Sequence, residues 1–385
     1  MKTPRKRKRI LTVWNKGYYC PEASNHLGTR KHREIVERAL AEDLIELHED
    51  TAFDEDSTWR AIAGVHDPAY VEAVRTGEPR SLAESQSFSW SPKLAQAVAL
   101  IWSGHLLACR LALKSGLAFH PASGAHHATR AKGGGFCTFN DLVGSGRTLV
   151  ADGTLSRVLI VDLDTHQGNG TWDLAKEDPR IALYDISGAS FEVPEVETDR
   201  LFFRLVRGAE SYFRMLEKLP QLLSSFRPEL VQYLAGMDCH QHDDMGGIPG
   251  MTAERLAERD GFVLEAARQA RVPLVLSPAG GYQKTGATVR LHLQTLRIAG
   301  GVDPREAVDS GIDSLALPNT RTYRCVLRSR DGSVFGTTPW TGEPPNVLFA
   351  PAVGNPTAFP NPRARRFERT QYRPRVLLVV YEEKN

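Results

Sequence analysis

The sequence lacks any run of about 18 or more apolar residues, the length that a helix needs to cross a membrane. Its basic first residues are not followed by an apolar stretch, so a secretory signal is not expected. The most apolar segment of helical length, residues 92–114, is interrupted by Lys93, His105 and Arg110. We therefore expect a protein that has no membrane partner.

Cysteine is also scarce, and the spacing of the five residues matters more than their number. They are odd in number and widely separated, without the pairs typical of a disulfide framework or a zinc finger: Cys20, Cys109, Cys137, Cys239 and Cys325. This pattern is typical of free thiols in a reducing compartment, so we expect a cytoplasmic protein.

An excess of charge of one sign is missing as well. The 48 Lys and Arg residues nearly balance the 46 Asp and Glu residues, which leaves a net charge of +2 and no general attraction to polyanions. Residues 1–9 are the exception, because they include Lys2, Arg5, Lys6, Arg7, Lys8 and Arg9. We expect them to form a solvated disordered tail, with nucleic-acid binding or a nuclear address as the alternative.

Apolar runs of strand length alternate with helical patterns along most of the chain. The expected strands lie near residues 10–14, 117–120, 158–163, 181–186, 230–235 and 272–277. The expected helices lie near residues 30–49, 92–114, 138–151, 208–226, 252–270 and 286–299, with Thr252 as an N-cap. This alternation predicts an α/β fold with a parallel sheet and helices on both of its faces.

The segment after residue 303 differs in composition, being rich in Pro, Arg and Thr. Asp331-Gly332 separates two β-like runs, residues 323–327 and 333–338, and predicts a hairpin. Residues 375–381 could add one more strand. We therefore divide the chain into a tail at 1–9, a catalytic domain at 10–303 and a C-terminal extension at 304–385. The extension is either a small β appendage, an oligomerisation element or a partly disordered segment.

The most informative stretch is Asp162-Leu163-Asp164-Thr165-His166-Gln167-Gly168-Asn169-Gly170, directly after the apolar run 158–161. Alternate residues of a strand share a face, so Asp162, Asp164 and His166 are expected to point the same way at a strand end. Ligands of open α/β sheets bind at such ends. Two carboxylates and an imidazole beside a turn suit zinc with an open position, provided that one more ligand arrives.

Three other apolar runs also end in reactive side chains. They lead to His126-His127, to Asp238 and to Tyr282. With Asp164 and His166, Asp238 would complete a zinc site. His126 or His127 would act as general base and then general acid, while Tyr282 would stabilise an oxyanion. Asp162 and Asn169 suit the orientation of the two imidazoles. The set predicts hydrolysis of an amide, and we expect His120 to be a packed histidine outside it.

Over about residues 10–303 the chain resembles the zinc-dependent histone deacetylases and their bacterial amidohydrolase relatives. The matching motifs are His66-Asp67-Pro68-Ala69-Tyr70, His126-His127, Gly134-Gly135-Phe136-Cys137, residues 162–170, Asp238 with Gly246-Gly247, and Gly280-Gly281-Tyr282. The chain is most similar to the class IV branch, on Gly133 to Cys137, His166 to Gly170 and Tyr184-Asp185. The resemblance implies an arginase-deacetylase-like single domain.

The resemblance assigns a role to each matching position. It makes Asp164, His166 and Asp238 the zinc ligands, His127 the proton shuttle and His126 its electrostatic partner. Tyr282 becomes the group that polarises the carbonyl, and Asp162 the residue that orients His126. The expected substrate-binding residues are Gly135, Phe136, Phe191, Gly280 and Gly281.

The resemblance also implies a potassium or other monovalent-cation site at Asp162 and Asp185. Two segments depart from the family pattern. The loop at residues 187–194 replaces a Phe-Phe-Pro-Gly type sequence, so that Phe191 is the candidate for the second aromatic wall. No carboxylate in residues 84–90 has a clear match to the one that grips the substrate backbone in many relatives.

The expected substrate is therefore an acylated lysine or an acylated small amine such as a polyamine, with long acyl groups allowed by the class IV resemblance. One alternative is a manganese ureohydrolase, since arginase-like proteins share the architecture. Another is a non-catalytic protein that binds acyl-lysine. A second metal site at His240 and His242 is not expected. Oligomeric state and acyl length stay open.

Overall fold

The computed structural model describes residues 8–20, 27–48, 53–122, 124–191, 193–283, 286–309 and 311–312, together with the backbone of four later strands. The chain divides into two units, residues 1–316 and residues 317–385. The first unit holds every residue of the predicted site. The second unit is described separately below.

The first unit is built on a sheet whose nine described strands follow the order β2-β1-β3-β9-β8-β4-β5-β7-β6. Neighbouring strands run parallel except β6, which is antiparallel to β7. The strands are β1 Ile10–Val13, β2 Ile45–His48, β3 Leu117–Phe119, β4 Val158–Asp162, β5 Ile181–Ser187, β6 Val196–Glu197, β7 Leu201–Leu205, β8 Leu230–Gly236 and β9 Leu274–Ala279.

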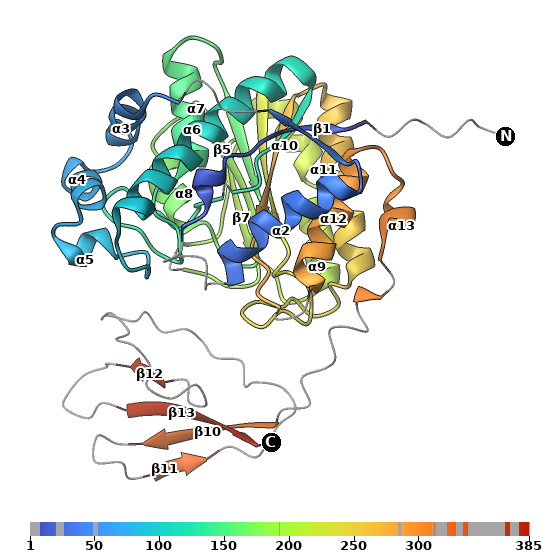
Figure 1. Ribbon diagram of the computed structural model, residues 1–385. Coiled ribbons are helices and arrows are strands. Elements are labelled where there is room, and N and C mark those ends of the chain that lie inside the picture. The colour runs from blue at the N-terminus through green and yellow to red at the C-terminus, as the bar shows by residue number, and fades with distance from the viewer. Residues whose placement is uncertain are drawn as a thin grey trace. The chain divides into compact units, whose positions relative to one another are not determined.

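Helices cover both faces of this sheet (Figure 1). One core cluster joins the sheet to α2 and to α9 through α12, and two others join the opposite face to α6, α7 and α8. The helices are η1 Lys16–Tyr18, α2 Leu27–Ala41, α3 Glu55–Ala63, α4 Pro68–Thr76, α5 Arg80–Ala83, α6 Pro92–Ser115, α7 Asp141–Ala151, α8 Asn169–Ala175, α9 Ala209–Leu216, α10 Leu219–Phe226, α11 Ala253–Ala270, α12 Ala287–Ala299 and α13 Pro304–Ala307.

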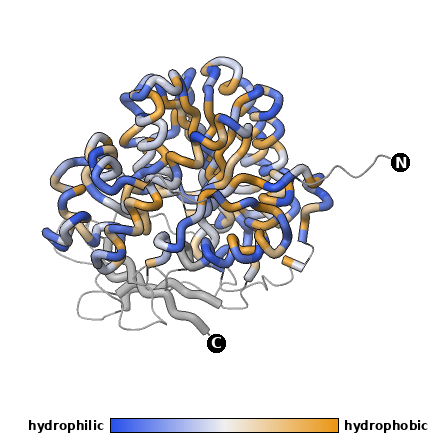
Figure 2. The backbone as a smooth tube through the Cα atoms, turned by 45° about the horizontal axis from the view of Figure 1, so that its top comes forward, coloured by the Kyte–Doolittle hydropathy of each residue, from blue (hydrophilic) through white to orange (hydrophobic). Residues whose placement is uncertain are grey.

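The central strands are apolar on both faces because helices cover both. In β4, Val158 and Ile160 pack with the α6 to α8 layer, whereas Leu159 and Val161 pack with the α9 to α12 layer. Figure 2 shows hydrophobic stretches of the backbone concentrated toward the middle of the first unit. The polar residues that follow such strands are therefore carried to the edge of the sheet.

The long helix α6 lies in the core. Ser91 caps its start by accepting a hydrogen bond from Leu94 N–H, and Gly116, at φ +85°, ends it. Of the helices that the structure describes, α6 alone is long and apolar enough to cross a membrane by length and composition. Its most apolar window is 61% buried, and the helix packs on β1, β3 and α7. Its hydrophobicity is thus accounted for by the core.

The helix predicted at 30–49 is wrong in its second half. α2 ends at Ala41, and β2 (Ile45–His48) pairs in parallel with β1. Asp43 has a φ of +55°, a conformation that Asp tolerates and that ends the helix. Ile45 is buried at the start of the new strand.

The helix predicted at 208–226 is two helices, α9 and α10. Pro220 lies in the first turn of α10, where its missing N–H is tolerated, and it would have broken a continuous helix. The helices α3, α4, α5 and α8 and the strands β6 and β7 were not predicted. The predicted N-cap is confirmed, because Thr252 accepts a hydrogen bond from Arg255 N–H at the start of α11.

Residues 1–7 of the predicted basic tail lie outside the described residues. Lys8 N–H bonds the carbonyl of Gly300 at 3.2 Å, and Arg9 lies within 3.7 Å of the Asp43 carboxylate. At the other end of this unit, α13 packs on α11 and α12, so residues 304–307 belong to it rather than to the extension.

The second unit contains a four-stranded antiparallel sheet in the order β11-β10-β13-β12. Its strands are β10 Thr322–Arg328, β11 Val334–Thr337, β12 Arg366–Arg369 and β13 Leu377–Lys384. Both the predicted hairpin and the predicted last strand are confirmed, while β12 was not predicted. The described strands form one sheet, and the role of the extension stays a prediction.

Candidate active site

The polar residues predicted at four strand ends gather at one edge of the sheet. β3, β9, β8 and β4 are neighbours in that order and run parallel, so their carboxyl ends lie together. The loop after β3 carries His126 and His127, β9 leads to Tyr282, β8 leads to Asp238, and β4 ends at Asp162. This is the edge at which open α/β sheets bind ligands.

Asp164, His166 and Asp238 form a compact ligand cluster. Each offers one ligand atom, and the three atoms lie within 4.8 Å of one another. His166 Nδ1 is 3.1 Å from Asp164 Oδ1 and 2.8 Å from Asp238 Oδ2. The backbone fixes the carboxylates, since His166 N–H donates to Asp164 Oδ1 and Thr165 N–H donates to Asp238 Oδ1. The predicted metal ligands are thus brought together.

The chemistry of this donor set fits a divalent cation. His166 Nε2 lies 3.1 Å from the Met245 carbonyl, which accepts its proton and leaves Nδ1 for a metal, the usual arrangement of ligating histidines. Burial and the neighbouring Asp164 carboxylate raise the pKa of Asp238 to about 7. A bound cation would relieve this repulsion. Two carboxylates and one imidazole suit a zinc ion that keeps an open position.

The two adjacent histidines have different partners. His126 Nδ1 lies 2.8 Å from Asp162 Oδ2, and His127 Nδ1 lies 2.7 Å from Asn169 Oδ1. Their ring centroids are 4.0 Å apart. Both orienting contacts expected from the sequence are therefore formed, one by a carboxylate and the other by an amide.

The partners set opposite charge states. Burial disfavours the charged form of His126, but the Asp162 carboxylate outweighs it and raises the pKa of His126 to about 9. Burial, together with charge on His126 and His166, holds the pKa of His127 well below its ordinary value. Because the Asn169 carbonyl oxygen accepts the Nδ1 proton, His127 keeps its lone pair on Nε2. His127 is thus the histidine able to accept a proton.

Tyr282 is held by its backbone beside the cluster. Its N–H donates to Asp243 Oδ2 at 2.7 Å, and its ring centroid lies 6.1 Å from that of His166. Burial and the nearby carboxylates raise the pKa of Tyr282 well above its ordinary value, so its hydroxyl stays a donor. Gly280 makes this turn feasible, because its φ is +41° and a Cβ there would lie 2.1 Å from the Asp238 carboxyl carbon.

Asp162 and Asp185 are neighbours across β4 and β5. Asp185 Oδ2 accepts from Gly168 N–H at 3.0 Å, its other oxygen accepts from the Ser187 hydroxyl, and Asp162 Oδ1 accepts from Asp164 N–H at 3.2 Å. Burial and the Asp162 charge raise the pKa of Asp185 well above its ordinary value. The neighbouring cluster of Asp164, His166 and Asp238 has three ligands, which suits one ion rather than two.

A cavity of about 170 Å³ lies at the site. Its wall includes His126, Asp164 and Tyr282 at one end. Three of the predicted substrate-binding residues line it: Gly135, Phe136 and Gly280. Much of the remaining wall is apolar and comes from η1, from α6 and from the residue that follows β1: Trp14, Tyr18, Leu94, Ala97, Val98 and Ile101.

Two predicted substrate contacts lie outside that cavity wall. The Phe191 ring is 42% exposed, and its centroid lies 4.9 Å from that of His127 and 6.1 Å from that of His166. It therefore covers the outer side of the site. A Cβ on Gly281 would point toward Thr288 and Met237, so Gly281 shapes the turn instead of contacting the cavity.

Two residues near the site were missed by the sequence analysis. Lys31 of α2 is buried, and its ammonium lies 5.8 Å from the Tyr282 ring centroid. Burial lowers the pKa of Lys31 to about 8, although the nearby Asp238 and Asp164 carboxylates oppose the change. The available signal was its spacing with Ile35 and Ala39, which marks the buried face of α2.

The second residue missed was Asp243, which lies in the loop after β8. It is partly buried and holds the backbone of Tyr282. It also accepts hydrogen bonds from Met245 N–H and Gly246 N–H. No local pattern indicated these contacts.

Comparison with known proteins gives consistent results. The histone deacetylase domain family matches residues 27–296. An uncharacterized protein of Picosynechococcus is 35% identical over 233 residues, which are 60% of this chain and 77% of that protein. Histone deacetylase 2 of Arabidopsis thaliana is 33% identical over 192 residues, 48% of this chain and 49% of the relative. The probable deacetylase of Methanothermobacter thermautotrophicus is 27% identical over 244 residues, 58% of this chain and 72% of the relative.

A solved structure shares the architecture. The acetylpolyamine aminohydrolase from Burkholderia pseudomallei has a TM-score of 0.61 and covers 76% of this chain and 98% of its own. At 16% identity, this likeness concerns the fold alone. The predicted fold class is therefore confirmed, and the class IV assignment stays a prediction.

Proposed function

The chain belongs to the histone deacetylase family, and from this premise we propose that it is a zinc-dependent deacylase. Membership of the family makes it a hydrolase of amide bonds. The proposed reaction removes an acyl group from a lysine side chain or from a small acylated amine. The observation that carries the proposal is the neutral His127 beside the Asp164, His166 and Asp238 cluster.

Asp164, His166 and Asp238 would hold the zinc ion. The proposal is supported by ligand atoms that already lie within 4.8 Å of one another and by His166 Nδ1, which faces both carboxylates. Bound zinc supplies a Lewis acid and a water of lowered pKa to such a site.

His127 would be the general base. Its Nε2 accepts a proton from the attacking water and later gives it to the leaving amine nitrogen. The contact with Asn169 supports this role, because it holds the other ring proton on Nδ1 and fixes the orientation of the ring. A neutral base at neutral pH follows from the lowered pKa of His127.

His126 and Tyr282 would stabilise the negative charge that develops on the acyl oxygen. His126 keeps a proton because Asp162 accepts its Nδ1–H bond, and it therefore places a positive charge beside His127. The Tyr282 hydroxyl remains a donor over the whole neutral range. Donors placed in this way act most strongly in a buried site, where little water screens them.

Aromatic residues would form the substrate passage. Phe136 lines the cavity and packs against Phe88 with ring centroids 5.6 Å apart, while Phe191 lies over His127. The Gly135 carbonyl could accept a hydrogen bond from the substrate amide. The apolar part of the cavity wall suits an acyl chain. The preferred length of that chain is measured by comparing substrates from acetyl to myristoyl.

A potassium ion would be held at Asp162 and Asp185. These two buried carboxylates are cross-strand neighbours, and burial together with the Asp162 charge raises the pKa of Asp185. A monovalent cation would let both remain ionised and would thereby support the charge on His126.

The experiment is deacylation followed by mass spectrometry. Zinc-loaded full-length protein is incubated with acyl-lysine peptides and acylated polyamines, from acetyl to myristoyl. We expect turnover of at least one substrate. His127→Ala should lower it by about 10²- to 10⁴-fold, whereas His48→Ala, which alters an exposed histidine of β2, should not.

Metal analysis of the same preparation tests the metal. Deacylation restored to the stripped protein by zinc supports the proposal, whereas two manganese ions per chain and no zinc in the purified protein would support the ureohydrolase alternative. Absence of turnover on every substrate in the panel, with zinc bound, would overturn the proposed substrate class. Binding of acylated peptides without turnover would support the non-catalytic alternative.

A further inference from the structure

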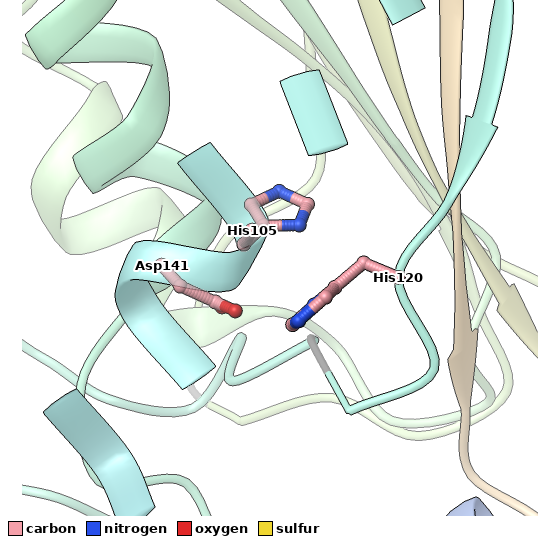
Figure 3. A group of neighbouring side chains, drawn as sticks. All are labelled: His105, His120 and Asp141. Atoms are coloured by element: carbon pink, nitrogen blue, oxygen red, sulfur yellow. The ribbon is translucent and has the colours of Figure 1, made fainter. Parts of the chain in front are cut away.

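Three metal-ligating side chains meet in the core next to the catalytic cavity. His105 belongs to α6, His120 follows β3, and Asp141 is the first residue of α7. Each offers one ligand atom, and the three atoms lie within 4.8 Å of one another. Figure 3 shows the three side chains converging on a common space from their separate elements. All three are almost fully buried.

Each of these buried side chains has one polar atom without a hydrogen-bond partner among the described residues. Within the part of the chain that the structure describes, no hydrogen-bond partner is found for His105 Nδ1, His120 Nδ1 or Asp141 Oδ2. Buried polar atoms are normally satisfied, and a buried carboxylate oxygen most of all. Three such atoms in one cluster form an arrangement that a positively charged ligand would satisfy.

The surroundings prepare His105 to act as a ligand. Its Nε2 lies 2.7 Å from Gln232 Oε1, and Gln232 Nε2 donates to the Leu142 carbonyl at 2.9 Å. The amide oxygen of Gln232 therefore faces the ring and holds its proton on Nε2, which leaves a lone pair on Nδ1. Support of this kind by a buried side chain is typical of metal-ligating histidines.

The neighbouring helix makes room for His120. Gly104 of α6 carries no side chain where a Cβ would lie 2.8 Å from His120 Nε2 and 1.8 Å from the Tyr18 hydroxyl. His120 Nε2 lies 3.2 Å from the Tyr18 hydroxyl, whereas His120 Nδ1 has no partner among the described residues.

We propose that His105, His120 and Asp141 bind a second divalent transition-metal ion of the zinc class. Two imidazoles and one carboxylate suit zinc, whereas calcium and magnesium prefer oxygen ligands. Ligand atoms of tetrahedral zinc lie about 3.4 Å apart, and modest side-chain rotation would close the cluster to that spacing. His120 then has a role that the sequence analysis did not give it.

The ion has a route of entry and a structural role. Asp141 and Tyr18 line the cavity that also reaches Asp164 and Tyr282, so the second site opens onto the same space. Asp141 Oδ1 also lies 3.4 Å from Ala125 N–H, directly before His126. The ion would tie α6 and α7 to the loop that carries both catalytic histidines.

The test is a metal count by mass spectrometry on tag-free, full-length protein dialysed against excess zinc. We expect about two ions per chain in the wild type, about one in Asp164→Asn and about one in His120→Gln. The matched control is His292→Gln, since His292 is also buried with an unpartnered Nε2 but belongs to no described ligand cluster. It should retain both ions.

Loading with cobalt adds a readout that does not depend on activity. The visible spectrum of Asp164→Asn protein should still show tetrahedral cobalt with nitrogen and oxygen ligands, and the additional change Asp141→Asn should weaken that binding. One ion in the wild type and none in Asp164→Asn would overturn the second site, even if the enzyme is active. Because these two preparations leave the second cluster intact, misfolding of a His120 variant cannot obscure the result.

Discussion

The two adjacent histidines of the proposed catalytic pair, His126 and His127, differ in the hydrogen-bond partner of Nδ1. His126 bonds a buried carboxylate, Asp162, whereas His127 bonds an amide, Asn169, at almost the same distance. The carboxylate raises the pKa of His126 to about 9, while the pKa of His127 is held well below its ordinary value. At neutral pH, His126 therefore carries a positive charge, whereas the adjacent His127 is neutral and keeps a free lone pair.

The difference shows that a role in catalysis is assigned by the partner and not by the histidine. Two imidazolium ions side by side would repel each other, so charge on His126 itself helps to keep His127 neutral. The arrangement separates electrostatic stabilisation from proton transfer. Four variants test whether that separation holds.

The largest effect is expected from His127→Ala. It removes the group that accepts and returns the proton, and general acid-base catalysis contributes about 10²- to 10⁴-fold. We expect kcat to fall by that amount while zinc content is unchanged, since His127 is not a ligand. Steady-state kinetics together with metal analysis checks this, and a loss below about ten-fold would assign the base role elsewhere.

Asp162→Asn should give the next largest effect. Without the carboxylate, the pKa of His126 falls from about 9, so the histidine loses its charge at a lower pH. We expect kcat/KM to fall by about 10- to 100-fold and its alkaline limb to move to lower pH. A pH profile with an unchanged alkaline limb would show that His126 does not act through its charge.

Asn169→Asp gives His127 a carboxylate partner like that of His126. It should shift the acid limb of the pH profile. A carboxylate on Nδ1 raises the pKa of His127, by about 1 to 3 units for a close partner. The base is active when deprotonated, so activity falls as pH drops through that pKa, and raising it moves the acid limb upward. The control Asn169→Ala should lower kcat without this upward movement.

The smallest effect is expected from Asp185→Asn. This change should alter the pKa of His126 and leave that of His127 unchanged. Asp185 adds only a minor contribution to the raised pKa of His126 and does not contact His127. We expect loss of potassium dependence and a shift of the alkaline limb by about half a unit, smaller than that in Asp162→Asn. An acid limb that moves as well would mean that the two sides are not separate.

Much of the fold could be predicted because its signals are local. The strands at β4, β8 and β9 are apolar runs followed by reactive residues, and their alternation with helices predicts the parallel sheet. The end of α2 could not be predicted from the sequence, because residues 42–49 continue its polar pattern. The strand there forms only through the pairing of Ile45 with Ile10. β7 was likewise revealed only by its pairing with β5.

By itself the sequence determined which side chains would meet at the sheet edge, since Asp164, His166, Asp238, the two histidines and Tyr282 all follow strand signals. Tertiary structure alone decided which histidine is charged, because that depends on partners 36 and 42 residues away. It also decided the burial of Lys31 and the meeting of His105, His120 and Asp141. Spacing along a chain fixes the face on which a residue lies, whereas charge and ligation depend on distances that only packing sets.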